Sequence, residues 1–349
     1  MTIRVLVVDD SAVMRDLLTR VIEQSSDIEV VGVAPDPHDA RELIKLLDPD
    51  VLTLDVNMPR MDGLEFLERL MRLRPMPVVM VSSYTEAGSD ATLRALELGA
   101  VDFIGKPRAD SERALEEYAE ELADKIRAAK NAHLCRSVGV NPVPKHAVPK
   151  LRSEIVSCAA NVLFMGASTG GTEAVKVFLQ GMPPNCPPVL VVQHMPETFT
   201  GSFARRLDSI CPPRVIEAKG NERIAQGTVY IAPGHSHLKI RRGSGCYMTE
   251  LSRAEPVNRH RPSVDVLFES AAEILGAKGM GVILTGMGKD GARGLLKMRQ
   301  SGARTFGQNE ASCVVYGMPR EAFEIGAVEY QASLEDLPKD VLSCLPGGK

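Results

Sequence analysis

Short apolar runs alternate with amphipathic helical stretches along the first 125 residues, and this alternation restricts the possible folds more than any other feature. The first run, residues 5–8, is β-branched and continuous, which is typical of a strand buried on both faces. From Met14 onward, apolar residues recur at helical spacing. The repeat predicts a parallel sheet of five strands with right-handed crossovers. We expect strands over residues 5–8, 29–33, 51–54, 78–81 and 102–104, and a last helix over residues 114–127.

Polar side chains follow four of these strands at the point where each ends. Asp9 and Asp10 follow the first strand, Asp55 the third, Ser82 the fourth and Lys106 the fifth. The carboxyl ends of parallel strands meet at one edge of a sheet, where ligands bind. Three carboxylates there repel one another unless a cation lies among them, and oxygen-only ligands suit Mg²⁺. One aspartate alone would be interpreted as a helix cap. Capping does not explain why five polar residues lie at the ends of four strands.

The chain then changes character. Residues 130–151 have no hydrophobic period and contain several prolines and lysines, as a linker does. We therefore predict one domain over residues 1–125, a linker over residues 126–155 and a second domain over residues 156–349. The second domain also alternates strands and helices, which predicts a doubly wound α/β fold. Its strands are expected over residues 161–165, 189–193, 228–232 and 281–285.

A glycine-rich turn, GASTGG at residues 166–171, joins the first of these strands to a helical stretch. This matches the strand, G-x-S-x-G, helix pattern in which Ser168 would be an exposed nucleophile. Backbone N–H groups near Ser168 and Met287, including that of Thr169, are candidates to hold an oxyanion. A phosphate-binding loop is the alternative. It is disfavoured because the G-x-G-x-x-G spacing is absent and the next strand ends in His194 instead of an acidic residue.

His194 is the leading candidate for the general base, because it ends the strand that follows the nucleophile. His260 ranks second, although its neighbours Arg259 and Arg261 would tend to lower its pKa, and its alternative role is to help bind an acidic substrate. His235 and His237 lie in a segment that we expect to be rich in turns.

Asp290 is the candidate third member, because it lies in a glycine-rich turn directly after the strand over residues 281–285. Its alternative role is to cap the helix expected over residues 292–300. Asp265 is the alternative acid. A triad is recognised by its geometry, so the chain order Ser168, His194, Asp290 does not exclude the chemistry.

Composition limits the possible partners. The net charge of -4 and the pI near 6.0 give no reason to expect nucleic acid. Seven cysteines, an odd number without a C-x-x-C pair, argue against a disulfide framework and a zinc site. No apolar run is long enough for membrane insertion, and no signal peptide is evident, so we expect a cytoplasmic protein.

The first domain resembles the response-regulator receiver domain over residues 3–125, a flavodoxin-like fold. The resemblance rests on VVDDS at residues 7–11, LDVNMP at residues 54–59, Ser82, and Lys106 with Pro107. It implies that Asp55 is the phosphoacceptor. It further implies that Asp9, Asp10, Asp55 and the Asn57 carbonyl bind Mg²⁺, that Ser82 and Lys106 contact the phosphoryl group, and that Phe103 is the aromatic residue that moves on activation.

The whole chain resembles the chemotaxis protein-glutamate methylesterase family, CheB. Four motifs carry the likeness in the second domain: GASTGGTEA at 166–174, QHMP at 193–196, VNRHRPSVD at 257–265 and LTGMGKDG at 284–291. The resemblance implies a hydrolase without a cofactor in its esterase reaction. Its substrates would be glutamate methyl esters and glutamines of chemoreceptors, and a chemotaxis histidine kinase would be the phosphodonor. The unphosphorylated receiver would cover the esterase site, with the linker as a hinge.

Two other hypotheses remain open. A non-catalytic response regulator, whose second domain binds a nucleotide or a protein, predicts that Ser168 is dispensable. A hydrolase of small-molecule esters predicts little effect of phosphorylation, but such an enzyme has no evident need for a receiver.

Overall fold

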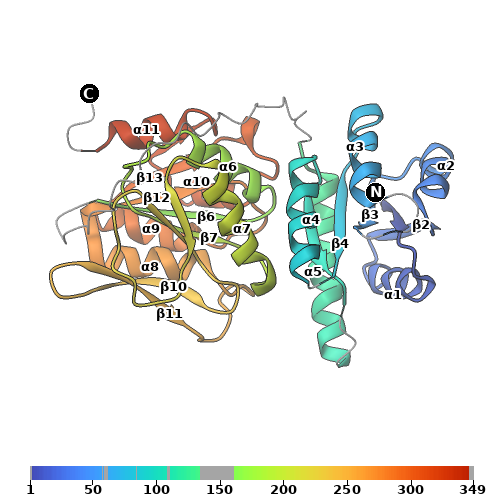
Figure 1. The fold of residues 1–349 in the computed structure, drawn as a ribbon, viewed down its shortest axis with the longest axis horizontal. Helices are drawn as coiled ribbons and strands as arrows, with labels where there is room; N and C mark the ends of the chain where they lie inside the picture. The colour runs from blue at the N-terminus through green and yellow to red at the C-terminus, as the bar shows by residue number, and fades with distance from the viewer. Residues whose placement is uncertain are drawn as a thin grey trace. The chain divides into compact units, whose positions relative to one another are not determined.

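The computed structural model describes residues 2–56, 58, 62–83, 85–107, 111–133 and 161–345. The chain divides into two compact units at residue 139, shown in blue to teal and in green to red in Figure 1. Asn57 and most of the expected linker lie outside the described residues. None of the described helices combines the length and the apolar character that a bilayer span requires.

The first unit is the expected parallel sheet of five strands, in the order β2-β1-β3-β4-β5. Helices follow the strands in strict alternation. The strands are β1 (Ile3–Val8), β2 (Ile28–Ala34), β3 (Val51–Asp55), β4 (Val78–Ser82) and β5 (Asp102–Gly105). The helices are α1 (Ala12–Ile22), α2 (Pro37–Leu47), α3 (Gly63–Leu73), α4 (Glu86–Glu97) and α5 (Glu112–Lys130).

Helix α5 is longer at both ends than the sequence pattern predicts. Ser111 caps its start by accepting the N–H of Ala114 at 3.2 Å. At its other end Lys130 forms an ion pair with Asp50. The first five residues of the predicted linker, 126–130, are therefore the end of this helix.

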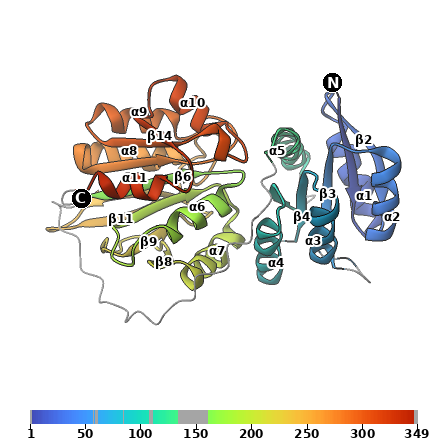
Figure 2. The ribbon, with the colours of Figure 1, turned by 90° about the horizontal axis from the view of Figure 1, so that it is seen from above.

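The second unit is built on a sheet of seven parallel strands in the order β14-β13-β12-β6-β7-β9-β8. Figure 2 shows α8, α9 and α10 on one face of this sheet and α6, α7 and α11 on the other. The parallel strands are β6 (Val162–Ala167), β7 (Val189–Gln193), β8 (Arg214–Glu217), β9 (Thr228–Ile231), β12 (Gly279–Ile283), β13 (Arg304–Gln308) and β14 (Tyr330–Ala332). The helices are α6 (Gly171–Gln180), α7 (Glu197–Ile210), α8 (Val264–Leu275), α9 (Ala292–Gln300), α10 (Met318–Glu324) and α11 (Leu337–Ser343).

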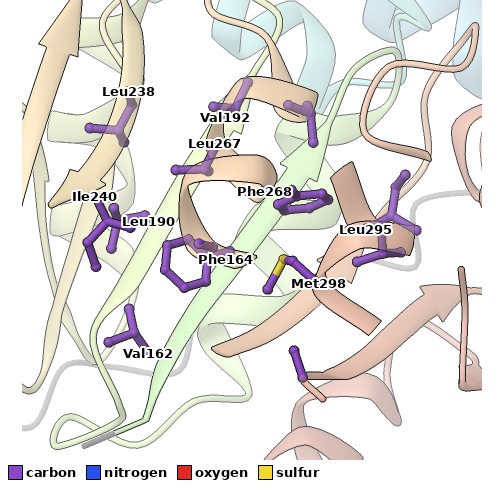
Figure 3. Packing of buried hydrophobic residues seen from close by; sticks show 14 of the residues in the cluster. Val162, Phe164, Leu190, Val192, Leu238, Ile240, Leu267, Phe268, Leu295 and Met298 are labelled. Atoms are coloured by element: carbon purple, nitrogen blue, oxygen red, sulfur yellow. The ribbon is translucent and has the colours of Figure 1, made fainter. Parts of the chain in front are cut away.

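An antiparallel hairpin, β10 (His237–Arg242) and β11 (Tyr247–Ser252), packs against α8. Its apolar residues Leu238 and Ile240 join Phe164 of β6 and Phe268 of α8 in one buried core (Figure 3). The prediction that His237 lies in a turn-rich segment is wrong, because His237 is the first residue of β10. The edge strands β8 and β14, their inner neighbour β13 and the hairpin were not predicted, since they are short or carry charged residues at alternate positions.

One glycine fixes how closely α8 approaches the sheet. A Cβ on Gly166 of β6 would lie 2.1 Å from Cγ1 of Val264, the first residue of α8. Only glycine permits this contact. The start of α8 is thereby seated against the strand that leads to Ser168.

Candidate active site

The acidic residues of the first unit meet at the carboxyl edge of its sheet. Asp9 and Asp55 are buried, Asp10 is exposed, and one carboxylate oxygen from each lies within 4.8 Å of the others. The ammonium of Lys106 lies 2.9 Å from Asp9 Oδ2 and 2.8 Å from Asp55 Oδ2. Burial alone would lower the pKa of Lys106, but its hydrogen bonds to Asp55 and Asp9 raise that pKa above the ordinary value. Lys106 therefore contacts two of the three carboxylates, and a divalent cation among the three would balance more of their negative charge.

Two further residues of the predicted phosphorylation site lie on the neighbouring strands. Ser82 ends β4 and is buried, with its hydroxyl donating to the carbonyl of Gly88 in α4 at 3.3 Å. Phe103 of β5 is buried, and the ammonium of Lys125 lies 5.9 Å from the centre of its ring. A ligand that captured the Ser82 hydroxyl would therefore release a contact that holds the first turn of α4.

We expect Lys106→Met to destabilise the first unit in a way that Mg²⁺ reverses. In EDTA, Lys106→Met removes the ammonium that contacts both buried carboxylates, Asp9 and Asp55, and puts no other cation in its place. The free energy of unfolding should fall by about 2–3 kcal/mol, less than for a fully buried pair because Lys106 is partly exposed. Millimolar Mg²⁺ should recover most of that loss, as measured by urea unfolding.

The matched control for this prediction is Lys125→Met. Lys125 pairs with Asp102 at 3.1 Å, away from the carboxylate cluster. Mg²⁺ should not restore the stability of this control. If Mg²⁺ stabilised the Lys106 and Lys125 variants equally, the three carboxylates would not form a cation site.

In the second unit, three side chains from adjacent strands form a continuous chain of hydrogen bonds. Ser168 follows β6, His194 follows β7, and Asp290 follows β12 after a short loop. Ser168 Oγ lies 3.2 Å from His194 Nδ1, and His194 Nε2 lies 2.8 Å from Asp290 Oδ2. An ionised Asp290 only accepts hydrogen bonds, so Nε2 carries the imidazole proton and Nδ1 is free to accept the serine proton.

The start of α8 holds the Asp290 carboxylate. The backbone N–H groups of Val264 and Asp265 donate to it at 2.7 and 3.2 Å, and the Ser263 hydroxyl donates at 2.8 Å. Asn258 donates its side-chain amide to the same carboxylate at 2.6 Å. Burial alone would raise the pKa of Asp290, but the bonds from His194, Asn258 and Val264 hold that pKa well below its usual range. Asp290 is therefore ionised throughout the neutral pH range.

The backbone around Ser168 is braced from both neighbouring strands. The Gln193 side chain donates to the carbonyl of Ser168 at 2.9 Å and to that of His194 at 3.2 Å. From the other side, the N–H of Ser168 donates to the Thr285 carbonyl at 3.1 Å. A Cβ on Gly286 would lie 2.8 Å from the Ser168 Cβ, so only glycine fits beside the serine.

The bond to Thr285 also bears on where an oxyanion could bind. The Ser168 N–H is already engaged, so it is not available to a developing negative charge. Thr169 and Met287, the two residues named as candidate donors, directly follow Ser168 and Gly286. Both candidates are thus next in sequence to residues that pack closely against each other.

The competing residues occupy different positions. His260 stacks on His194, with ring centroids 3.7 Å apart and an interplanar angle of 17°. Asp265, in the first turn of α8, accepts from the N–H of Gly294 in α9 at 2.7 Å and from the side-chain amide of Asn258 at 2.8 Å. Burial and the nearby charge of Asp290 raise the pKa of Asp265. The geometry thus favours His194 as the base and Asp290 as its partner.

The other two histidines are engaged in local bonds. His235 Nδ1 lies 2.7 Å from the Ser236 hydroxyl. His237 Nδ1 accepts from the N–H of Ser263 at 3.1 Å, and its Nε2 faces the Glu255 carbonyl at 3.0 Å. His237 therefore supports the start of α8 and does not contact the serine.

Comparison with known proteins assigns each unit to a family. Residues 163–341 match the family described as CheB methylesterase, and residues 5–118 match the response regulator receiver domain. The protein-glutamate methylesterase/protein-glutamine glutaminase 1 of Dechloromonas aromatica (strain RCB) is 67% identical over 346 residues, which cover 98% of each chain. The chain belongs to the CheB methylesterase family.

Two further members of the CheB family support the comparison. A protein-glutamate methylesterase/protein-glutamine glutaminase of Methylobacillus flagellatus is 58% identical over 99% of this chain and 97% of its own length. The crystal structure of the Thermotoga maritima CheB methylesterase catalytic domain aligns with a TM-score of 0.51 and 38% identity. The alignment covers 52% of this chain and 97% of the Thermotoga maritima catalytic domain. The α/β folds predicted for both domains are thereby confirmed.

Three residues of the CheB site had no role in the sequence analysis: Gln193, Asn258 and Ser263. Each acts through a hydrogen bond to another site residue instead of facing a substrate. Gln193 and the other two lie in the motifs at 193–196 and 257–265, so their positions were flagged although their contacts were not. Polar residues without a titratable group give no signal of which backbone group or carboxylate they bind.

Proposed function

We propose that this chain hydrolyses glutamate methyl esters on chemoreceptors, deamidates receptor glutamines, and is activated by phosphorylation of Asp55. The observation that carries the proposal is the hydrogen-bonded chain from Ser168 through His194 to the ionised Asp290. The relatives of this chain carry the names protein-glutamate methylesterase and protein-glutamine glutaminase. The receiver domain adds a reason for control by phosphorylation.

The first half of the reaction forms an acyl-enzyme. Ser168 Oγ attacks the ester carbonyl carbon while its proton passes to His194 Nδ1. The ionised Asp290 stabilises the imidazolium and keeps the ring in the required tautomer. N–H groups at Thr169 and Met287 stabilise the oxyanion. The tetrahedral intermediate then collapses, and His194 returns the proton to the methoxide, which leaves as methanol.

The second half releases the product. Water gives a proton to His194 Nδ1 and attacks the acyl carbon, and the Ser168 oxygen leaves with that proton. The product is a receptor glutamate. A glutamine side chain follows the same route, with ammonia as the first leaving group. Because both reactions transfer an acyl group to water, one site serves both, and no step in this half of the protein needs a cofactor.

The receiver residues fit a phosphorylation site. We propose that Asp9, Asp10, Asp55 and the carbonyl of Asn57 hold Mg²⁺, which would offset the negative charge of the incoming phosphoryl group. Three carboxylates grouped within 4.8 Å around one lysine suit this hard, oxygen-seeking cation. Asp55 would accept the phosphoryl group from a chemotaxis histidine kinase. Lys106 would then pair with that group, and Ser82 would bond it, with Phe103 moving in response.

We further propose that the protein works in the cytoplasm, where it would meet the cytoplasmic helices of chemoreceptors. The part of the predicted linker that follows α5, residues 131–155, would transmit the state of the receiver to the esterase domain. Its last part, residues 134–155, lies outside the described residues, so this part of the proposal rests on the family.

The test is methanol release from a methylated chemoreceptor, measured for the full-length protein with and without a small phosphodonor and Mg²⁺. We expect release by the unmodified protein to rise severalfold with phosphodonor and Mg²⁺. Asp55→Asn has no carboxylate to phosphorylate, so its release should not respond. Rates should be compared at equal concentrations of folded protein.

The competing hypotheses give different results. A non-catalytic binding protein would release no methanol in any condition. An esterase of small molecules would hydrolyse a free methyl ester as well as the receptor and would ignore the phosphodonor. A response to phosphodonor that survives in Asp55→Asn would remove Asp55 as the phosphoacceptor.

A further inference from the structure

A tight turn contacts the triad although none of its residues belongs to the triad. In the 257–260 turn, Val257 and His260 exchange two backbone hydrogen bonds, at 3.1 and 2.9 Å. The two residues between them, Asn258 and Arg259, have φ angles of 54° and 66°. A two-residue turn with positive φ at both central positions is a type I′ turn.

The residues on both sides of Arg259 contact the triad. Asn258 donates its amide to Asp290 at 2.6 Å, and His260 stacks on His194 with a centroid distance of 3.7 Å. Arg259 is exposed. Its backbone is thus fixed at the edge of the triad, while its long side chain lies at the surface.

Arginine is an unfavourable residue at this place in a turn. The second central position of a type I′ turn favours glycine, because other side chains crowd the backbone when φ is positive. Asn258 tolerates such a conformation well, whereas Arg259 does not. Residues held in such conformations gather at functional sites, where the surrounding structure imposes the strain. The Asn258 and His260 contacts impose it here.

The surface around this turn is basic although the whole chain carries a net charge of -4. The segment 253–261 contains three arginines and one glutamate. Exposed Lys289 directly precedes Asp290, whose own charge is buried. An anionic ligand that approached Ser168 would therefore meet positive charge on both loops that support the triad.

We propose that Arg259 binds a carboxylate of the polypeptide substrate beside the reacting ester, so that the enzyme selects esters flanked by acidic side chains. The proposal rests on the proposed function and adds the chemical class of its substrate segment. Arginine suits this task because its planar guanidinium donates two parallel hydrogen bonds to a carboxylate. Arg259 is here a specificity-determining residue and takes no part in proton transfer.

The test compares two synthetic peptides that carry one γ-methyl glutamate, flanked by glutamates in one and by glutamines in the other. Methanol release is measured with the phosphorylated full-length protein. We expect the unmodified protein to have a KM about 10- to 100-fold lower for the glutamate-flanked peptide, the range for one charge-assisted bond. This preference should shrink as NaCl is raised from 50 to 500 mM.

Arg259→Gly should abolish the preference, bringing the ratio of the two KM values close to one. Glycine accepts the positive φ, so the variant should also melt at a higher temperature than the unmodified protein. Loss of selectivity together with a gain in stability cannot come from damage to the turn. Arg259→Asn, which also tolerates this conformation, provides the same comparison if the glycine variant does not fold. Lys339→Gln on α11 removes the same charge from an exposed site and should keep the preference.

Two results would overturn the proposal. One is equal KM values for both peptides with the unmodified protein. The other is an Arg259→Gly variant that keeps the preference for the glutamate-flanked peptide, or that lowers kcat equally on both peptides. Either result for this variant would mean that Arg259 only supports the turn. Failure of the proposed function itself would look different, because the unmodified protein would then release methanol from neither peptide.

Discussion

Ser168→Ala is expected to slow methanol release by about 10⁴-fold or more, because alanine has no atom that can form the acyl-enzyme. The residual rate would come from direct attack by water, with the oxyanion donors and His194 still in place. The fold should survive, because the Ser168 hydroxyl contributes one hydrogen bond at 3.2 Å to a ring that Asp290 and His260 also hold. Methanol release under single-turnover conditions measures the effect on the chemical step.

The control for this variant is Ser209→Ala, which removes an exposed hydroxyl near the end of α7. That hydroxyl donates only to the carbonyl of Arg206, at 2.7 Å. Its methanol release and melting temperature should both match those of the unmodified protein. Release by Ser168→Ala within tenfold of the unmodified protein would exclude Ser168 as the nucleophile and favour a binding role for the second domain.

Much of the fold was predictable because buried parallel strands have a clear sequence signature. The runs at β1, β3, β6 and β7 are largely apolar, and a polar residue ends or directly follows each of them at the sheet edge. The hairpin β10–β11 has no such signature. Strand β10, with the sequence HLKIRR, alternates apolar residues with charged ones, and its burial depends on contact with α8. That contact is tertiary and is not encoded in the local pattern.

The active site shows the same division. The contact of Ser168, His194 and Asp290 was predictable, because each follows a strand of one parallel sheet at the same edge. The stack of His260 on His194 was not predictable, since nothing in the local sequence states that the 257–260 turn folds back over β7. The sequence instead made His260 the second candidate for the base, with binding of an acidic substrate as its alternative role. The stack itself and the bond from Asn258 to Asp290 show that this loop belongs to the site.

Asp290→Asn is expected to lower kcat by about 10⁴-fold while the protein remains folded. Both carboxylate oxygens of Asp290 accept hydrogen bonds, from His194 and Val264 on one and from Ser263, Asn258 and Asp265 on the other. Asparagine has one oxygen and one NH₂ group in place of these two oxygens, so its NH₂ group must face one of the two sets of donors. If that group faces His194, Nε2 must accept, so the imidazole proton moves to Nδ1 and the ring can no longer deprotonate Ser168.

The matched variant is Asp265→Asn, which makes the same chemical change in a carboxylate of similar burial. Asp265 shares Asn258 with Asp290 but does not bond to His194. Because burial and the Asp290 charge already raise the pKa of Asp265, a neutral residue there removes a repulsion. The kcat of Asp265→Asn should therefore stay within about tenfold of that of the unmodified protein. Thermal melting should show that both variants are folded. Equal losses of kcat in the two folded variants would mean that the charge of the α8 cluster matters as a whole, and that Asp290 does not set the tautomer of His194.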